Sequence, residues 1–276
     1  MYDLNHLAKH LQSASLKKKD ATFIHLHEND QLISFEDFFQ NAEKIASALI
    51  SAGIRPGDRV AMQVEKSSSA IELYFGTILA GAGFLPLNTA YVAEEIDFFL
   101  RDARPSIFVC DPSKLNNYTK IAESSGVSHI WTLSAEGTGS LIDAKNAESP
   151  GFTGVKRNPD DLAAVLYTSG TTGHSKGAML THRNLQSNAE ALVNCWQFTD
   201  EDILIHALPL YHTHGLFVAT NVSLLAGSSM LLMKKFDADA ICRRMPQASV
   251  LMGVPTFYVR LLQHPDLENA AKKMRL

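Results

Sequence analysis

The sequence predicts an α/β fold in which parallel β-sheets are covered by helices. Short apolar runs typical of buried strands alternate along the chain with longer segments whose apolar residues recur at helical spacing. Such alternation is typical of parallel sheets whose two faces are covered by the connecting helices. A length of 276 residues is enough to bury a large core, in one large domain or two smaller ones.

The first well-marked element is a helix in the N-terminal part of the chain. Ser34 followed by Asp37 resembles a capping box, and apolar residues then recur at helical spacing from Phe35 to Leu49. Gly53 stands where a C-terminal cap is expected. The next predicted elements are a strand over 59–64, helices over 70–79 and 91–103, and a strand over 107–110.

The segment 134–158 is rich in Ser, Gly, Glu and Asn, and we expect it to be a polar excursion on the surface of the domain. The alternation resumes after it. Strands are predicted over 162–167, 203–207, 230–233 and 249–252. Helices are predicted over 183–196, 216–225, 238–245 and 256–263, and Thr181 is expected to cap the first of these helices.

Composition and charge indicate an ordinary globular protein, which we expect to be cytoplasmic. Hydrophobic residues make up 46% of the chain, and the formal net charge of −4 gives no general attraction for nucleic acid. The three cysteines include no C-x-x-C pair, which argues against a disulfide framework or a zinc site. No apolar stretch is long enough to span a bilayer, and the N-terminus does not resemble a secretory signal.

The most informative segment lies between the predicted strand at 162–167 and the predicted helix at 183–196. Residues 168–173 contain four hydroxyl side chains and two glycines, and a lysine follows three residues later. Glycines let backbone N–H groups approach phosphate closely, hydroxyls donate to its oxygens, and a lysine adds positive charge. We therefore predict a phosphate-binding loop. Its predicted binding residues are Thr168, Ser169, Gly170, Thr171, Thr172, Gly173 and Lys176.

Other interpretations of this loop fit less well. A flexible linker has a similar composition, but linkers seldom lie between two strongly apolar elements or carry a lone lysine beside a glycine. From Gly170 the pattern is G-x-x-G-x-x-K-G, which differs both from the P-loop G-x-x-x-x-G-K-[ST] and from G-x-G-x-x-G. The spacing therefore disfavours ordinary kinases, GTPases and dinucleotide-binding proteins.

Two long motifs carry a family resemblance. The run Y-T-S-G-T-T-G-H-S-K-G-A-M-L-T-H over 167–182 resembles the phosphate-loop signature of the adenylate-forming enzymes, the superfamily of acyl-CoA synthetases, luciferases and peptide-synthetase adenylation domains. The run L-P-L-Y-H-T-H-G-L over 208–216 is similar to the acyl-pocket motif of the same superfamily. Further runs resemble the malonyl-CoA synthetases most closely, and they lie at 85–91, 211–219 and 252–258.

The resemblance implies an ATP-dependent acid–thiol ligase acting on malonate or a similar short dicarboxylate. In such enzymes a carboxylate attacks the α-phosphorus of ATP, pyrophosphate leaves, and the acyl-adenylate then reacts with the thiol of coenzyme A. The protein mainly positions groups and neutralises developing charge. The hydroxyls of the loop would bind the β- and γ-phosphates, Lys176 would follow the departing pyrophosphate, and Mg²⁺ would accompany ATP.

The histidines of the second motif allow three interpretations. His212 and His214 have the i, i+2 spacing of one side of a strand, which is compatible with a metal site that His206 could join. No nearby Cys or carboxylate pattern completes a zinc set, so we expect no metal there. Purely structural histidines are the second interpretation. The resemblance implies the third, in which His212 lies beside the reacting carboxylate and the α-phosphate and acts as a catalytic residue.

A dicarboxylic substrate also needs a partner for its second carboxylate, because burying an unpaired charge is very unfavourable. Arginine gives bidentate pairing with a permanent positive charge. Arg260 and Arg275 occupy positions at which malonyl-CoA synthetases have arginine, and either could contact the distal carboxylate. For each of them the alternative is an ordinary surface arginine.

The resemblance further implies that residues 1–276 form the N-terminal part of a longer fold, with two αβ subdomains. The adenine-binding segment, most Mg²⁺ ligands and a mobile C-terminal domain are expected to be missing, so the chain alone is expected to be inactive. Two alternatives remain open. One is a non-catalytic module that binds nucleotide or another protein, and the other is a short-chain acyl-CoA synthetase of different acyl specificity.

Overall fold

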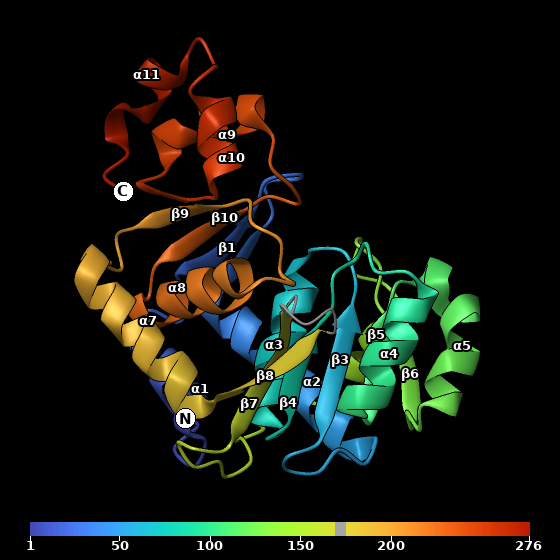
Figure 1. The fold of residues 1–276 in the computed structure, drawn as a ribbon. Helices are drawn as coiled ribbons and strands as arrows, with labels where there is room; N and C mark the ends of the chain where they lie inside the picture. The colour runs from blue at the N-terminus through green and yellow to red at the C-terminus, as the bar shows by residue number, and fades with distance from the viewer. Residues whose placement is uncertain (169–174) are drawn as a thin grey trace. The chain divides into compact units, whose positions relative to one another are not determined.

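The computed structural model of the chain describes residues 1–168 and 175–276, and it divides into two compact units (Figure 1). Unit 1 comprises Met1–His10 and Phe39–Gln186, and unit 2 comprises Leu11–Phe38 and Ser187–Leu276. Both units contain a largely parallel β-sheet and helices. The predicted α/β class with two αβ subdomains is therefore confirmed.

Unit 1 contains a six-stranded sheet. Its strands, in spatial order, are β6 (His129–Thr132), β5 (Ile107–Cys110), β3 (Arg59–Gln63), β4 (Gly83–Pro86), β7 (Leu162–Thr168) and β8 (Lys176–Thr181). Neighbouring strands are parallel except for the last pair, because β7 and β8 form an antiparallel hairpin. The central strands β3, β4 and β5 are almost entirely apolar and buried, as expected for parallel strands covered on both faces.

Helices cover this sheet. They are the first part of α1 (His6–Gln12), the C-terminal part of α2 (Phe35–Ser51), α3 (Ser68–Leu79), α4 (Ala93–Ala103), α5 (Leu115–Ser124), α6 (Ser140–Asn146) and the start of α7 (His182–Trp196). α4 and α5 bury Phe99, Leu100 and Tyr118 against Ala61 and Phe108 of the central strands. Helix α3 is buried along almost its whole length, and Ser67 caps it by accepting a hydrogen bond from the Ala70 amide.

The segment 134–158, predicted to be a polar surface excursion, includes the helix α6. Leu141 on this helix is buried, and Lys145 forms an ion pair with the buried carboxylate of Glu72 at 3.5 Å. These two contacts attach part of the segment to unit 1.

Unit 2 contains a five-stranded sheet in the order β11 (Val250–Met252), β9 (Ile203–His206), β10 (Ser229–Leu232), β1 (Thr22–Leu26) and β2 (Leu32–Ser34). Only β2 is antiparallel to its neighbour. The other elements of the unit are the end of α1, the start of α2, the rest of α7, a π-helix (His214–Thr220), α8 (Asn221–Ala226), α9 (Ala238–Arg244), α10 (Pro255–Leu261) and α11 (Leu267–Ala270). Short 3₁₀ turns lie at Ser15–Lys17, Met245–Gln247 and Ala271–Lys273.

The predicted capping of α2 is confirmed. The Asp37 amide donates to the Ser34 hydroxyl at 3.0 Å, and the Ser34 amide donates to the Asp37 carboxylate at 3.4 Å. These two reciprocal bonds form a capping box, so local sequence chemistry determines where this helix begins.

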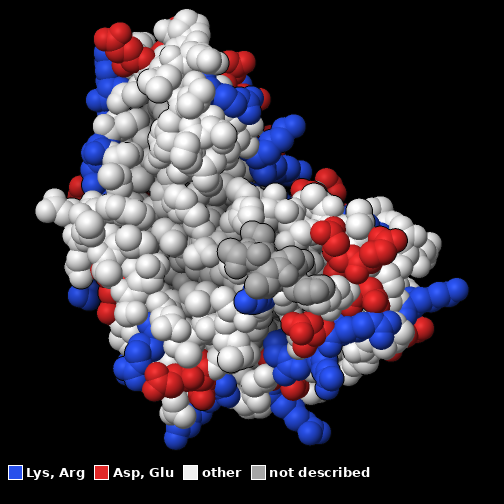
Figure 2. Space-filling model, viewed as in Figure 1, with Lys and Arg blue, Asp and Glu red and all other residues white. Residues whose placement is uncertain are grey.

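Helix α10 presents an exposed apolar surface. Tyr258 and Val259 of α10 and Leu262, the residue after it, are 43%, 57% and 76% exposed. The upper part of the face seen in Figure 2 is mostly uncharged, with charged side chains along its borders. Within the described part of the chain, no helix is long and apolar enough to cross a membrane.

Candidate functional site

The predicted phosphate-binding segment is the connection between the two strands of the β7–β8 hairpin. β7 ends at Thr168 and β8 begins at Lys176, and these two residues are direct partners in the antiparallel ladder. Directly opposite side chains lie on the same face of a sheet, so the Thr168 hydroxyl and the Lys176 ammonium flank the connection together. Both residues are exposed. The other predicted binding residues, Ser169, Gly170, Thr171, Thr172 and Gly173, lie outside the described residues.

The hairpin begins at the edge of the sheet where ligands usually bind in α/β folds. β7 is parallel to β4, with Phe84 opposite Ala164, so Thr168 lies at the carboxyl edge of the parallel strands. Ligands of open α/β sheets bind outside this edge, at points where the strand order reverses. The chain provides such a reversal, because β4 and β5 lie on opposite sides of β3.

Two polar side chains at the same edge hold the loop that follows β4. The Gln63 amide donates to the carbonyls of Asn88 and Tyr91 at 2.8 and 3.0 Å, and the Lys114 ammonium donates to the Thr89 carbonyl at 2.8 Å. These contacts fix residues 88–91, which belong to one of the runs that resemble malonyl-CoA synthetases. The roles of Gln63 and Lys114 could not be identified from the sequence, because both contacts join residues far apart in the chain.

Helix α7 follows β8 and begins as predicted. The Asn184 amide donates to the Thr181 hydroxyl at 3.1 Å, and the Thr181 amide donates to the Asn184 side chain at 2.9 Å. His182 is fully buried in unit 1, where its Nδ1 accepts a hydrogen bond from the Leu7 amide at 3.3 Å. Burial lowers the pKa of His182 to about 4, and the positive charge of Arg157 acts in the same direction.

This buried histidine predicts a loss of stability in weak acid. His182 binds its proton near pH 6.5 when unfolded but only near pH 4 when folded, so the unfolded state gains protons first. The contribution of neutral His182 to the free energy of unfolding is fully present above pH 6.5. It is lost as the pH falls from 6.5 to 4, and the total loss is about 3 kcal/mol. Urea unfolding at pH 7.5 and pH 4.5 measures it. In His182→Asn, which keeps an acceptor for the Leu7 amide, the acid-induced loss should be smaller by about 2 kcal/mol. Equal losses in both proteins would contradict this assignment.

His212 lies in unit 2, in the segment that joins β9 to the π-helix. Its side chain is exposed, its ring packs edge-on against Tyr211 at 4.7 Å, and its carbonyl accepts from the Leu216 amide. The π-helix begins two residues later, and such helices are rare and frequently mark functional sites. His212 is therefore accessible to a ligand.

The geometry of this segment depends on His206 and Gly215. His206 is buried at the end of β9, and its Nε2 lies 2.8 Å from the carbonyl oxygen of Gly215, to which it donates. A Cβ atom at Gly215 would lie only 2.1 Å from the carbonyl oxygen of Pro209. His206 thus holds the first turn of the π-helix. His214 is partly buried, and this burial lowers the pKa of its imidazole.

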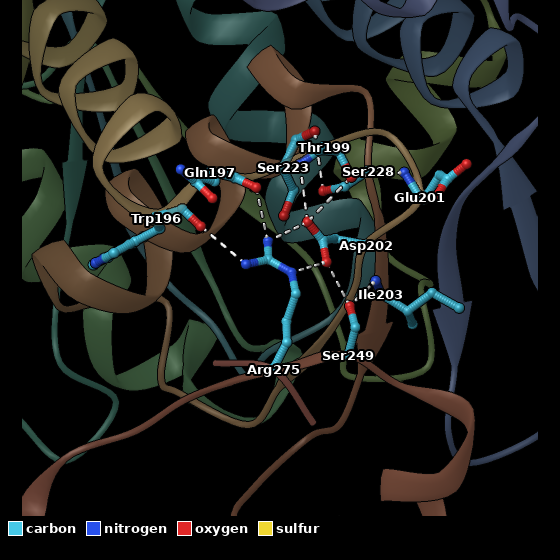
Figure 3. Close-up of polar contacts among 10 residues, drawn as sticks. All are labelled: Trp196, Gln197, Thr199, Glu201, Asp202, Ile203, Ser223, Ser228, Ser249 and Arg275. Atoms are coloured by element: carbon cyan, nitrogen blue, oxygen red, sulfur yellow. Dashed lines mark hydrogen bonds and ion pairs between the residues drawn. The ribbon is translucent and has the colours of Figure 1, made fainter. Parts of the chain in front are cut away.

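Arg275 is engaged in a polar network within unit 2 (Figure 3). Its Nε donates to the Asp202 carboxylate at 2.8 Å, and its two terminal nitrogens donate to the carbonyls of Trp196 and Gln197 at 2.9 and 3.1 Å. Asp202 is buried and also accepts from Ser249 at 2.7 Å. Burial alone would raise the pKa of Asp202, but the bonds from Arg275 and Ser249 outweigh it, so the carboxyl pKa is lowered.

Arg260 has different surroundings. It projects from α10, and its guanidinium carbon lies 4.6 Å above the centre of the Phe236 ring. The Phe236 ring in turn packs against the tilted ring of Phe257, with 4.1 Å between the ring centres. Its side chain is exposed, and within the described residues no hydrogen bond or ion pair engages the guanidinium. Of the two predicted arginines, Arg260 is thus the one whose donors are available to a carboxylate.

The side chains of the described residues do not assemble a metal centre. No group of three or more His, Cys, Asp or Glu side chains among them could hold a metal ion. His206, the residue that could have joined His212 and His214 at a metal, instead donates to a carbonyl of its own segment.

Comparisons with known proteins identify the family and the fold of the chain. The family of AMP-binding enzymes matches residues 11–276. The structure resembles apo MatB from Rhodopseudomonas palustris with a TM-score of 0.95 and 49% identity, over 99% of this chain and 54% of MatB, and ATP-bound MatB equally well. Among curated relatives, feruloyl-CoA synthase of an Amycolatopsis species is 32% identical over 86% of this chain and 47% of its own length. Malonate–CoA ligase of Arabidopsis thaliana is 29% identical, over 81% of this chain and 40% of its own.

The chain therefore spans about half the length of the proteins that it matches. The matched region contains both motifs on which the sequence resemblance rests, at 167–182 and 208–216. The chain belongs to the AMP-binding enzyme family.

Proposed function

We propose that this chain is the nucleotide-binding part of an ATP-dependent acid–thiol ligase that converts malonate, or a similar short dicarboxylate, into its CoA thioester through an acyl-adenylate. The observation that carries the proposal is the β7–β8 hairpin. It places a hydroxyl and an ammonium directly opposite each other, at the carboxyl edge of the sheet, on either side of a hydroxyl- and glycine-rich connection. Family membership and the likeness to ATP-bound MatB support ATP as the nucleotide.

The residues of this chain would act mainly by positioning and by electrostatics. The Thr168 hydroxyl would donate to a phosphate oxygen, and the Lys176 ammonium would neutralise the charge that develops on the departing pyrophosphate. His212 would donate a hydrogen bond to the reacting carboxylate or the α-phosphate. The acyl-adenylate would then be attacked by the thiol of coenzyme A. Because the chain covers only about half of its relatives, we propose that alone it binds polyphosphate without completing the ligation.

A dicarboxylate is the proposed acid for two reasons. The Arabidopsis thaliana relative is a malonate–CoA ligase, and Arg260 offers a guanidinium without an anionic partner within the described residues. Phe236, whose ring packs against Phe257, covers one side of this guanidinium, and its N–H groups can pair with a carboxylate in bidentate fashion. The similarity to a feruloyl-CoA synthase supports a second candidate, an acyl-CoA synthetase of aromatic specificity.

The proposed function can be tested in a chimera that joins residues 1–276 to the remaining part of MatB, since the two chains share 49% identity here. We expect ATP–pyrophosphate exchange with malonate at a rate at least tenfold above that with acetate, propionate or ferulate. Exchange that prefers ferulate would favour the second candidate. A cooperatively folded chimera that binds ATP but supports no exchange with any acid would favour a non-catalytic nucleotide-binding module.

Substitutions of Arg260 and Arg275 should have different effects in the same chimera. Arg260→Met should lower kcat/KM for malonate roughly 10- to 100-fold while leaving the value for propionate almost unchanged, because a charge-assisted pair is lost. Arg275→Met should instead lower the free energy of unfolding by about 2 kcal/mol, because the buried Asp202 carboxylate loses its strongest donor, and malonate should stay preferred. Exchange kinetics and urea unfolding measure the two effects. Loss of malonate preference in Arg275→Met alone would reverse the assignment.

A further inference from the structure

Tyr167, the last residue of β7 before Thr168, is held in place from three directions. Its hydroxyl donates to the carboxylate of Asp102 on α4. Its ring packs against Phe99 on the same helix, with 4.6 Å between the ring centres, and Phe98 approaches its edge at 6.3 Å. Phe99 itself is part of the buried core of unit 1. The tyrosine therefore connects the end of β7 to a helix that is anchored in the core.

The third contact is with β8. Gly177 is the direct partner of Tyr167 in the ladder, and the ring of the tyrosine lies across it. A Cβ atom at Gly177 would lie 3.2 Å from Val165 Cγ1 and 3.4 Å from two ring atoms of Tyr167. The absence of a side chain at Gly177 thus lets one ring contact both strands of the hairpin and α4.

Asp102 occupies a position in α4 at which a negative charge destabilises a helix. It lies in the last turn of α4, which ends at Ala103 and is capped by Arg104 in the left-handed conformation. A carboxylate there meets the negative end of the helix dipole, so its place is not explained by the stability of the helix. The hydrogen bond from Tyr167 offers an explanation. Burial and the neighbouring carboxylate raise the pKa of Tyr167, so its hydroxyl stays protonated and keeps donating.

The register links this arrangement to the candidate site. Tyr167 precedes Thr168, Gly177 follows Lys176, and the two pairs are consecutive rungs of one ladder. Successive side chains point to opposite faces, so Tyr167 packs toward α4 while Thr168 and Lys176 share the other face. Any displacement of the Tyr167–Gly177 pair would therefore also move the Thr168 hydroxyl and the Lys176 ammonium of the adjacent pair.

We propose that Tyr167, hydrogen-bonded to Asp102, is a positioning residue that fixes the base of the β7–β8 hairpin and so sets the placement of Thr168 and Lys176 for phosphate binding. The inference rests on the proposed function for its ligand, but the mechanical coupling between α4 and the hairpin stands on contacts within unit 1 alone. Tyr167 acts through its neighbours, and it need not touch the substrate.

The test compares five variants of the 276-residue chain, four single ones and the double variant that combines Tyr167→Phe with Asp102→Ala. Tyr167→Phe and Asp102→Ala each remove the hydrogen bond, whereas Asp102→Asn keeps an acceptor without the charge. Asp97→Ala is the matched control, because it removes another carboxylate of α4, one that pairs with Arg101 at 2.8 Å. One readout is the affinity for inorganic pyrophosphate by calorimetry. The other is amide hydrogen exchange along β7 and β8.

We expect Tyr167→Phe and Asp102→Ala to weaken pyrophosphate binding about 3- to 10-fold, as the loss of one hydrogen bond would. The double variant should be no weaker than either single one, because both remove the same bond. Amide exchange next to Thr168 and Lys176 should rise several-fold in these variants. Asp102→Asn and Asp97→Ala should resemble the wild type in both readouts, and melting temperatures should stay within roughly 3 °C.

The outcomes separate the two proposals. If the wild type does not bind pyrophosphate, the proposed function fails, and hydrogen exchange still decides whether Asp102 fixes the hairpin. If exchange along β7 and β8 is unchanged in both Tyr167→Phe and Asp102→Ala, the positioning role is wrong whatever the ligand does. The positioning role is also wrong if the wild type binds pyrophosphate and both variants bind it equally well.

Discussion

Replacing Lys176 by alanine is expected to lower the rate of malonate-dependent ATP–pyrophosphate exchange roughly a hundredfold in the chimera with MatB. Removing one preorganised group that stabilises developing charge typically raises a barrier by about 3 kcal/mol. The side chain is exposed at the start of β8, opposite Thr168, so its removal should not disturb the core. The effect should appear mainly in kcat, because pyrophosphate carries its full charge only as it departs.

The matched control for this variant is Lys120→Ala, which removes an exposed lysine from α5 in the same unit. It should leave the exchange rate within about twofold, because surface substitutions rarely matter by more than about 0.5 kcal/mol. If Lys176→Ala exchanged pyrophosphate as fast as the wild type, the role of this lysine in the proposed mechanism would be lost.

Replacing Gly215 by alanine is expected to destabilise unit 2 by about 3 kcal/mol or more. The added methyl group would lie 2.1 Å from the carbonyl oxygen of Pro209 and 3.1 Å from Leu208 Cβ. The obstacle is backbone, which cannot move away as the end of a flexible side chain could. The first turn of the π-helix would have to shift, and with it the bond from His206 and the segment that carries His212. Thermal melting should show a fall of roughly 10 °C.

Gly253→Ala provides the comparison, because the three atoms nearest to a methyl group there would be side-chain atoms of Phe257 and Tyr258, at 3.3 Å. It should change stability by no more than about 1 kcal/mol. Equal melting temperatures for Gly215→Ala and the wild type would mean that the π-helix can shift without loss, and that the close contact does not fix the His212 segment.

Much of the fold could be predicted because it depends on local signals. The reciprocal Ser34–Asp37 cap and the Thr181 cap of α7 are short-range chemistry, and both are present. The buried strands β5, β7, β9 and β10 have continuous apolar sequences that need no knowledge of their partners. The predicted limits of the helices around these strands are close to the observed ones, because each helix is identified from apolar residues at helical spacing within one continuous segment.

The elements that could not be predicted depend on contacts between distant residues. β8 contains a lysine, a glycine and the exposed Met179, and it has no apolar alternation; pairing with β7 makes it a strand. β1 pairs with β10, about two hundred residues away, in the register Ile24 to Met230. The π-helix depends on the approach of Gly215 to Pro209, which no sequence pattern indicates.

The residues of the candidate site likewise fall into those that local motifs identify and those that depend on contacts between distant residues. The phosphate-binding segment and His212 could be identified because their motifs are continuous in sequence. The difference between Arg260 and Arg275 could not, since it depends on Asp202, which lies 73 residues from Arg275. The contact between Tyr167 and Asp102 spans 65 residues, and no local pattern indicates it either.

The proposed mechanism depends above all on the β7–β8 hairpin binding the triphosphate end of a nucleotide. Calorimetric titration of the 276-residue chain with ATP, inorganic tripolyphosphate and AMP examines this binding without any contribution from another domain. We expect similar affinities for ATP and tripolyphosphate, and at least tenfold weaker binding of AMP. AMP binding as tight as that of ATP, or a folded chain that binds neither polyphosphate, would contradict the proposal.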